Sequence, residues 1–335
     1  MKFLVTGATS GLGRNAVEWL LTQGHHVHAT GRNQIAGKEL TTLGAKFTAL
    51  DLVTATDTDY LQLLSDCDIV WHCAALSSPW GRYEWFYQAN TVITARLAQL
   101  AGKSGIKRFI HISTPSIYFD FQSHQNITED YLAEHFANHY ANTKYEAEKR
   151  IQECVKLYPD TVYLILRPRG IFGPHDRVII PRILAILNRT GGILYLPGGG
   201  QAFVDLTFVL NVVHALYLAS DKQNIQSGNA FNITNQQPCK LDDLIHLLLK
   251  DQLNLHYKIR SLPYRLLYDA AALLEGIASL TNKEPALTRY SVGTLYFDMT
   301  LSQKMAIERL GYQPLYNMNE SVHLTAQWLQ QSGHV

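Results

Sequence analysis

The sequence has few of the features that mark metal, disulfide or membrane proteins. It contains four cysteines in 335 residues, scattered without a CxxC pair or a Cys/His spacing typical of a metal site: Cys67, Cys73, Cys154 and Cys239. We therefore expect no metal centre, and we interpret the cysteines as reduced thiols of a cytoplasmic protein. No apolar run reaches the length of a transmembrane helix, and the N-terminal run is too short for a signal peptide.

The sequence also lacks an excess of charge of either sign. The net charge is +1 and charged residues make up 17% of the chain, so the sequence gives no sign of a nucleic-acid partner. The hydrophobic content of 47% is that of an ordinary soluble globular protein. A chain of this length can form one large domain or two moderate ones.

A short strand, a glycine-rich loop and a helix follow one another at the start of the chain. The apolar residues 2–6 stop at Gly7, and helical periodicity runs over 15–23. Glycines in this context permit a tight turn and let a pyrophosphate approach the backbone at the start of the helix. We therefore predict a dinucleotide site on the loop Gly7-Ala8-Thr9-Ser10-Gly11-Leu12-Gly13.

The end of the second predicted strand, 26–30, bears on the choice of cofactor. Enzymes that prefer NAD usually carry an acidic residue here, which binds the ribose hydroxyls. This chain has Gly31-Arg32-Asn33 instead, and Arg32 stands where a 2′-phosphate needs a cation. The sequence therefore favours NADP(H), with NAD(H) as the alternative.

Further strands and helices alternate through the first half. We expect strands at 46–50, 68–75, 108–112 and 162–166, and helices at 84–101 and within 131–157. Asp51 and Leu52 follow the third strand, where the carboxylate can accept from the adenine amino group. Ala74 and Ala75 end the fourth, and their small side chains leave room for a cofactor. This alternation predicts an α/β fold with a doubly wound parallel sheet.

Two groups of polar residues point to proton transfer. Tyr140 and Lys144 are four residues apart on the predicted helix, so their side chains share a face. An ammonium beside a phenol is expected to lower the pKa of the phenol toward the range useful for a base. The fifth strand runs into hydroxyl residues at 113–118, at the edge of the sheet where ligands bind.

Taken together, these stretches resemble the extended short-chain dehydrogenase/reductase superfamily, which is the NAD-dependent epimerase/dehydratase superfamily. The motifs that carry the resemblance span nearly the whole chain: Thr6-Gly7-Ala8 with Gly11 and Gly13, Asp51-Leu52, 72–75, 113–118, Tyr140 with Lys144, 167–174, Phe297-Asp298, 310–314 and Trp328. Within it, 167–176 is similar to the branch of 3β-hydroxysteroid and sterol dehydrogenases and 2-alkyl-3-oxoalkanoate reductases. The loop departs from the extended pattern, because Ser10 replaces a glycine and the spacing is that of shorter, single-domain members.

The resemblance implies a role for each matching residue. Tyr140 would be the general acid/base, Lys144 would lower its pKa and bind the nicotinamide ribose, and Thr114 would bind the substrate oxygen, with Ser113 and Ser116 as alternatives. The cofactor would be held by the residues Gly7, Thr9, Ser10, Gly11, Leu12, Gly13, Arg32, Asp51, Leu52, Ala74, Ala75, Tyr140, Lys144, Pro168 and Ile171.

The second half resembles the small, interleaved substrate domain of extended members. We expect 1–175 to form the NADP(H)-binding domain, with strands from roughly 201–235 returning to it, and 176–335 to be mainly substrate-binding. The apolar stretch 262–280 carries Arg265, Asp269 and Glu275, so it is not a membrane span. It is either a packed helix, a cover over a lipophilic substrate, or a surface that touches a membrane.

The leading hypothesis is an NADP(H)-dependent oxidoreductase that interconverts a ketone and a secondary alcohol on a lipophilic, steroid-like or 3-oxoacyl substrate. A nucleotide-sugar epimerase or dehydratase on the same scaffold is the alternative, although Pro115-Ser116 replaces the acidic pair of the dehydratases. A redox sensor without turnover would not need Thr114, Tyr140 and Lys144. Family members commonly pair two helices in a homodimer, and we expect the apolar residues Val92, Ala95, Leu97, Leu100 and Ala101 to permit this.

Overall fold

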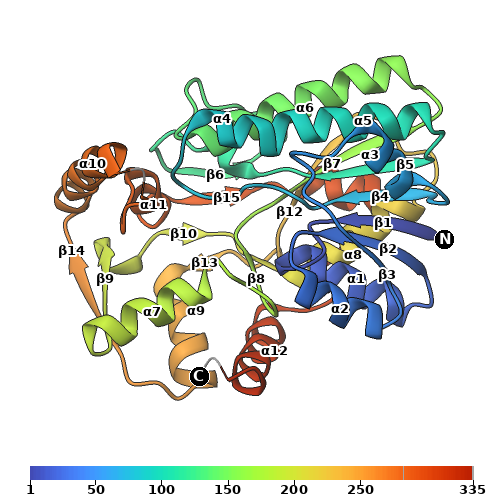
Figure 1. Cartoon of the computed structure of the whole chain (residues 1–335). Coiled ribbons are helices and arrows are strands. Elements are labelled where there is room, and N and C mark those ends of the chain that lie inside the picture. Colours follow the sequence, from blue (N-terminus) through green and yellow to red (C-terminus); the bar gives the residue numbers. More distant parts are fainter. Residues whose placement is uncertain (282, 334–335) are drawn as a thin grey trace.

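The computed structural model describes residues 1–281 and 283–333, and its largest element is a seven-stranded sheet (Figure 1). All neighbouring strands are parallel, in the order β12-β7-β5-β4-β1-β2-β3. The strands are β1 (Lys2–Thr6), β2 (His26–Gly31), β3 (Lys46–Ala49), β4 (Ile69–His72), β5 (Arg108–Ile112), β7 (Val162–Pro168) and β12 (Ala230–Ile233). The doubly wound parallel sheet predicted from the alternating pattern is confirmed.

Helices cover both faces of this sheet. One face carries α1 (Gly11–Thr22), α2 (Gln34–Thr42) and α8 (Val209–Asp221), and the other carries α3 (Asp57–Leu64), α5 (Ile93–Lys103) and α6 (His139–Leu157) (Figure 1). A separate apolar core fills each side, because the strands are buried on both faces. The strands β1, β4 and β7 are accordingly mostly apolar, whereas β2 and β5 carry the buried histidines His28 and His111 within the sheet.

The helix predicted over 84–101 is divided into three pieces. α4 (Tyr83–Phe86) and α5 flank a π-helical segment, η1 (Tyr87–Val92). Asn90 in this segment donates to Thr143 Oγ1 and Leu76 O, and Thr91 donates to Thr143 O at 2.8 Å. The wider turn aims these polar side chains at α6, and so it fixes the helix that carries Tyr140 and Lys144.

The same helix corrects one expectation about self-association. Leu97, Leu100 and Ala101 are buried in the protomer's own core, where they pack with residues of α3 and α6. They cannot also form a surface for a second copy. Of the five apolar residues considered for a dimer interface, Val92 and Ala95 are partly exposed, and a homodimer stays a prediction.

The second half interleaves with the first. Among its described strands, only β12 joins the main sheet. The strands β10 (Phe203–Val204), β13 (Cys239–Lys240) and β15 (Met299–Leu301) form a second, four-stranded sheet with β6 (His124–Ile127). Short strand pairs join β8 (Ile171–Phe172) to β11 (Thr207–Phe208) and β9 (Ile193–Pro197) to β14 (Lys258–Leu262). The remaining elements are η2 (Pro115–Tyr118), α7 (Ile180–Thr190), η3 (Gly198–Gly200), α9 (Leu241–His246), η4 (Leu247–Gln252), α10 (Tyr264–Thr281), α11 (Arg289–Thr294), η5 (Ala306–Leu310) and α12 (Met318–Gln331).

The apolar stretch 262–280 forms α10, which lies at the periphery of the second half (Figure 1). Its inner face is buried through Ala271, Glu275 and Ala278, whereas Leu273 and Leu280 on its outer face are 72% and 84% exposed. Across the described residues, no helix combines the length and the apolar character that a bilayer span requires. α10 is therefore not simply a helix of the hydrophobic core, because its outer apolar face is exposed.

Candidate active site

The glycine loop packs closely against the end of β4. Gly7 adopts a φ of +65°, and a Cβ there would lie 2.9 Å from the Ala74 Cα. A Cβ on Gly13 would lie 2.2 Å from the Gly7 carbonyl oxygen. Only glycine fits at these two positions, and the resulting bare backbone at the start of α1 suits the pyrophosphate of a dinucleotide. The residues present therefore fit the cofactor that the sequence predicts.

A cavity of about 820 Å³ opens above the carboxyl ends of β1, β2, β4, β5 and β7. It is lined by fifteen of the sixteen residues proposed for the site: Gly7, Thr9, Ser10, Gly11, Leu12, Gly13, Arg32, Asp51, Leu52, Ala74, Ala75, Thr114, Tyr140, Pro168 and Ile171. Lys144 is the exception. Its ammonium is buried behind the lining, with the side chain 1% exposed.

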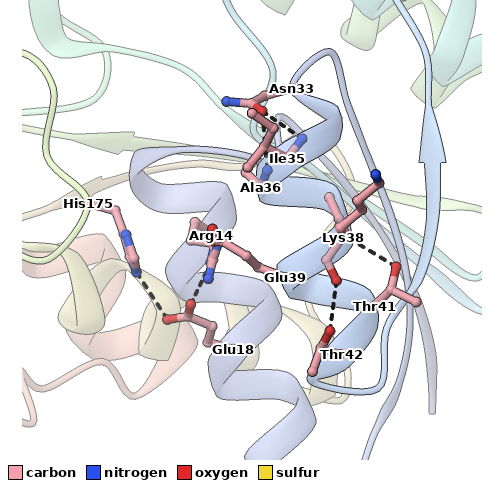
Figure 2. A network of polar contacts seen from close by, with 11 residues as sticks. Arg14, Glu18, Asn33, Ile35, Ala36, Lys38, Glu39, Thr41, Thr42 and His175 are labelled. Atoms are coloured by element: carbon pink, nitrogen blue, oxygen red, sulfur yellow. Dashed lines mark hydrogen bonds and ion pairs between the residues drawn. The ribbon is translucent and has the colours of Figure 1, made fainter.

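Two arginines lie near the end of β2 and differ in their partners. Arg14 on α1 donates to Glu18 at 2.5 Å and to Glu39 at 2.7 Å, and Glu18 is also 3.3 Å from His175 Nε2 (Figure 2). This network ties α1 to α2. Arg32 is exposed, lines the cavity and forms no ion pair with a described residue. Arg32 is therefore the cation available to a phosphate at this end of the cavity.

Four hydroxyl groups form a connected chain at the floor of the cavity. Tyr140 on α6 is hydrogen-bonded to Thr114, and Thr114 Oγ1 donates to Ser116 Oγ at 2.9 Å. Ser116 Oγ is in turn 2.7 Å from the hydroxyl of Tyr290 on α11. Thr114 is held in place because it caps η2, accepting from Ser116 N at 3.1 Å. The chain links the first half of the protein to the second.

The pKa of Tyr140 differs from the expectation. Burial raises it to about 12, although the hydrogen bond with Thr114 acts in the opposite direction. The Lys144 ammonium does not contact the phenol; it donates to Ile112 O at 2.6 Å and lies 2.9 Å from His111 Nε2. The predicted lowering of the Tyr140 pKa by Lys144 is thus absent, because the backbone carbonyl and the imidazole hold the ammonium beneath the sheet edge.

Burial also shifts the groups around Lys144. It lowers the pKa of Lys144 to about 7, against the opposing charge of Glu148, and it lowers the pKa of His111. The His111 ring stacks on His72 with centroids 5.3 Å apart, and His72 is hydrogen-bonded to Thr6 and Thr94. Both histidines are buried in the core and hydrogen-bonded, and His111 positions Lys144.

Some residues of the site carried no signal in the sequence. Tyr290 lies 150 residues after Tyr140, outside every motif, and reaches the site only through the fold. Arg169 lies inside the recognised segment 167–174, but neither its spacing nor its neighbours indicated a role for its side chain. His175 follows the same segment, but it lines neither cavity: its ring packs 5.3 Å from that of Trp328 and its Nε2 faces Glu18.

A second cavity of about 1160 Å³ adjoins the first and shares Leu76, Trp85 and Tyr290 with it. It lies between the loops 76–86 and 131–139 and the inner face of α10. Aromatic rings line much of it: Trp80, Trp85, Phe86, Phe121, Tyr131, Phe136, Tyr268 and Tyr290. The space beyond Tyr140 therefore suits an apolar molecule.

Comparisons with known proteins agree with this geometry. The family model described as NAD dependent epimerase/dehydratase family matches residues 3–234. The chain is 44% identical to the uncharacterized protein YbjS of Escherichia coli (strain K12), with 99% of each chain covered. It is 29% identical to the sterol-4-alpha-carboxylate 3-dehydrogenase, decarboxylating, of Mus musculus (97% of this chain, 90% of the relative). The 2-alkyl-3-oxoalkanoate reductase of Stenotrophomonas maltophilia is also 29% identical (96% and 97%).

Among solved structures, the UDP-glucuronic acid 4-epimerase of Bacillus cereus in complex with NAD has a TM-score of 0.79. It is 20% identical, and 99% of this chain and 97% of the epimerase are covered. At that identity the likeness extends to the fold. The matches confirm the resemblance inferred from the motifs, including its sterol dehydrogenase and oxoalkanoate reductase branch.

Proposed function

Because the chain belongs to the NAD-dependent epimerase/dehydratase family and is therefore an NAD(P)-dependent enzyme, we propose that it interconverts a ketone and a secondary alcohol on a lipophilic substrate. The observation that carries the proposal is the pairing of Tyr140 and Thr114 at the point where the cofactor-sized cavity meets the aromatic cavity. The names of two relatives point to the same class, a sterol carboxylate and a 3-oxoalkanoate.

The charges of the aromatic cavity favour this reading over a nucleotide sugar. Four carboxylates line it, and only two guanidinium groups among its described residues oppose them: Asp120, Glu134, Glu275 and Glu284 against Arg82 and Arg289. Arg289 is already paired with Glu275 at 2.6 Å. Glu284 is paired as well, with Arg182 at 2.8 Å. Because carboxylates already engage these guanidinium groups, a diphosphate would meet little uncompensated positive charge in this cavity, whereas an apolar chain or ring system needs none.

In the proposed reaction, the cofactor and the residues of the site have separate roles. A bound nicotinamide cofactor supplies or accepts the hydride. In reduction, Tyr140 donates a proton to the carbonyl oxygen and Thr114 holds that oxygen by a hydrogen bond. The raised pKa of Tyr140 keeps the phenol protonated at neutral pH, which is the form a reduction needs. The glycine loop at 7–13, Asp51, Ala74 and Pro168 would hold the cofactor, and Lys144 would stand behind its ribose.

The proposal is tested by cofactor consumption with a panel of substrates. We expect the purified protein to oxidise NADPH in the presence of a 3-oxo ester or a steroid ketone, measured as loss of NADPH absorbance. With UDP-glucose we expect no new sugar product. Epimerised sugar without net consumption of cofactor would overturn the proposal in favour of the alternative.

We propose further that the cofactor is NADP(H), held through Arg32. The Arg32→Ala variant is expected to bind NADPH about tenfold more weakly, because a charged hydrogen bond to a phosphate is lost at a partly solvated site. Its affinity for NADH should be unchanged. Quenching of tryptophan fluorescence in titrations with each cofactor measures both constants.

The matched control is Lys38→Ala, which removes an exposed positive charge from α2 nearby but outside the cavity. This variant should bind both cofactors as the wild type does. Equal binding of NADPH and NADH by the wild type, or a preference for NADH that Arg32→Ala leaves unchanged, would contradict the assignment and point to NAD(H).

A further inference from the structure

The hydroxyl chain at the floor of the cavity extends beyond the two residues that would touch a substrate oxygen. From Tyr140 and Thr114 it continues over 2.9 Å to Ser116 Oγ, and from there over 2.7 Å to the hydroxyl of Tyr290. Both distances are those of ordinary O–H···O hydrogen bonds. Each hydroxyl can donate one hydrogen bond and accept another, so a proton removed at one end of the chain can be replaced from the other end.

Packing holds the two outer members of this chain in place. Ser116 lies in η2, which Thr114 caps by accepting from Ser116 N at 3.1 Å, so both hydroxyls leave the same turn. The ring of Tyr290 packs edge-on against the buried ring of Phe119, with centroids 5.5 Å apart and an interplanar angle of 87°. The contact between Ser116 and Tyr290 therefore belongs to the packed structure.

The outer end of the chain faces the aromatic cavity. Tyr290 lines both cavities, whereas Thr114 and Ser116 line the first cavity and not the second. Exposed side chains bound part of the aromatic cavity, among them Trp85 and Glu134, so solvent can reach the Tyr290 hydroxyl from that side. A substrate in front of Tyr140 would exclude water from the phenol itself, and the hydroxyl chain would still connect the phenol to solvent.

The other side of Tyr140 leads into the core. The Lys144 ammonium donates to Ile112 O at 2.6 Å and lies 2.9 Å from His111 Nε2. His111 is 0% exposed, and its Nδ1 has no hydrogen-bond partner among the described residues. The ring of His72, on which His111 stacks, is also 0% exposed. A proton that moved along Lys144 and His111 would therefore end among buried groups and not in solvent.

We propose that Ser116 and Tyr290 form a proton relay that reprotonates Tyr140 from the aromatic cavity in each turnover. The inference rests on the proposed function and concerns the supply of its proton. After Tyr140 has protonated the substrate oxygen, the Thr114 hydroxyl, which is free to rotate, gives its proton to the phenolate. Thr114 then takes a proton from Ser116, and Ser116 takes one from Tyr290. Water in the aromatic cavity reprotonates Tyr290.

The relay balances at every step. Each transfer breaks one O–H bond and forms another, and the net change is the uptake of one proton from solvent for each ketone reduced. In the direction of oxidation the same transfers run in reverse and release one proton. Tyr140 carries a proton before the first ketone binds, so the relay is needed only from the second turnover onward.

The test records cofactor and proton in one stopped-flow experiment. Enzyme, NADPH and methyl 3-oxodecanoate are mixed in weak buffer with a pH indicator, and loss of NADPH absorbance is followed together with proton uptake. In the wild type we expect proton uptake to keep pace with NADPH loss. In Ser116→Ala the first turnover should keep the wild-type rate, whereas proton uptake should lag behind it and later turnovers should be about tenfold slower.

Three further variants define the relay. Tyr290→Phe removes the outer hydroxyl and should show the same lag, and Ser116→Thr keeps a hydroxyl and should restore the wild-type behaviour. The control is Tyr296→Phe, which removes an exposed tyrosine hydroxyl just beyond α11 that lines neither cavity. This variant should match the wild type in both signals.

Two results would overturn the relay. If Ser116→Ala slows the first turnover as much as the later ones, Ser116 has a structural role only. If proton uptake keeps pace with NADPH loss in both Ser116→Ala and Tyr290→Phe, water reprotonates Tyr140 directly. Neither result affects the proposed function, because the wild type still reduces the ketone. A wild type that reduces no ketone would instead refute the proposed function, and the relay with it.

Discussion

The Tyr140→Phe variant is expected to lose about 10³-fold in kcat for ketone reduction while it binds the cofactor as tightly as the wild type. General acid catalysis by a positioned side chain contributes roughly 10²–10⁴-fold, and phenylalanine removes the proton without altering the ring. The phenol is hydrogen-bonded to Thr114 at the floor of the cavity, so no other described hydroxyl occupies its place. Stopped-flow or steady-state kinetics with NADPH measure the loss, and fluorescence titration measures cofactor binding.

A second tyrosine on α6 provides the matched control. Tyr145 packs 5.4 Å from Phe136, with Lys149 above its ring, and it does not line the cavity. Tyr145→Phe should therefore keep the wild-type kcat. A Tyr140→Phe variant that retains more than about a tenth of the wild-type rate would exclude Tyr140 as the proton donor, and Tyr290, at the other end of the hydroxyl chain, would be the next candidate.

The two directions of the reaction should also differ in their dependence on pH. The pKa of Tyr140 is raised to about 12, chiefly by burial, so the protonated phenol that a reduction needs persists through neutral and mildly alkaline pH. Oxidation needs the phenolate as a base. The rate of oxidation is therefore expected to rise with pH up to at least about 9. Over the same pH range the rate of reduction should not fall.

The parts of the fold that could be predicted are those that a stretch of consecutive residues specifies. β1, the glycine loop and α1 follow one another within residues 2–22, so periodicity and glycine positions suffice to identify them. The seven-stranded sheet follows from the repetition of such units, because right-handed crossovers leave few other arrangements. The second sheet could not be predicted from the sequence, because it pairs β6 at 124–127 with β15 at 299–301. No local pattern specifies a pairing between segments so distant in the chain.

The same distinction separates the predicted and the missed parts of the site. Thr114 and Tyr140 belong to short motifs, and the structure brings them together as expected. The Lys144 side chain was expected to face the phenol because both lie on one face of α6. Its ammonium is drawn to Ile112 O and His111 Nε2 instead, and helical spacing cannot anticipate an acceptor on β5. The arrival of Tyr290, from α11, at the site likewise depends on which distant segments the fold brings together. The same holds for the lack of a hydrogen-bond partner for Arg169 Nε among the described residues.

The buried ion pair that anchors α6 leads to the largest expected effect on stability. Arg167 on β7 donates to Glu148 at 2.9 and 2.5 Å, and also to the Tyr118 hydroxyl and to Glu129 O. The two side chains are 8% and 5% exposed. Removing one member leaves the other charged and buried without a partner, so Arg167→Met is expected to lower the free energy of unfolding by about 3–5 kcal/mol.

The experiment is denaturant unfolding of Arg167→Met, of the double variant Arg167→Met/Glu148→Met, and of Arg150→Met. The double variant should recover much of the loss, because no unpaired carboxylate remains in the core and the methionines fill the space with apolar atoms. Arg150→Met disrupts an exposed pair with Glu153 on the same helix and should cost less than about 1 kcal/mol. A single-variant loss as small as that of Arg150→Met would show that solvent reaches Glu148. The pair could then not be what fixes α6, and with it Tyr140, against the end of β7.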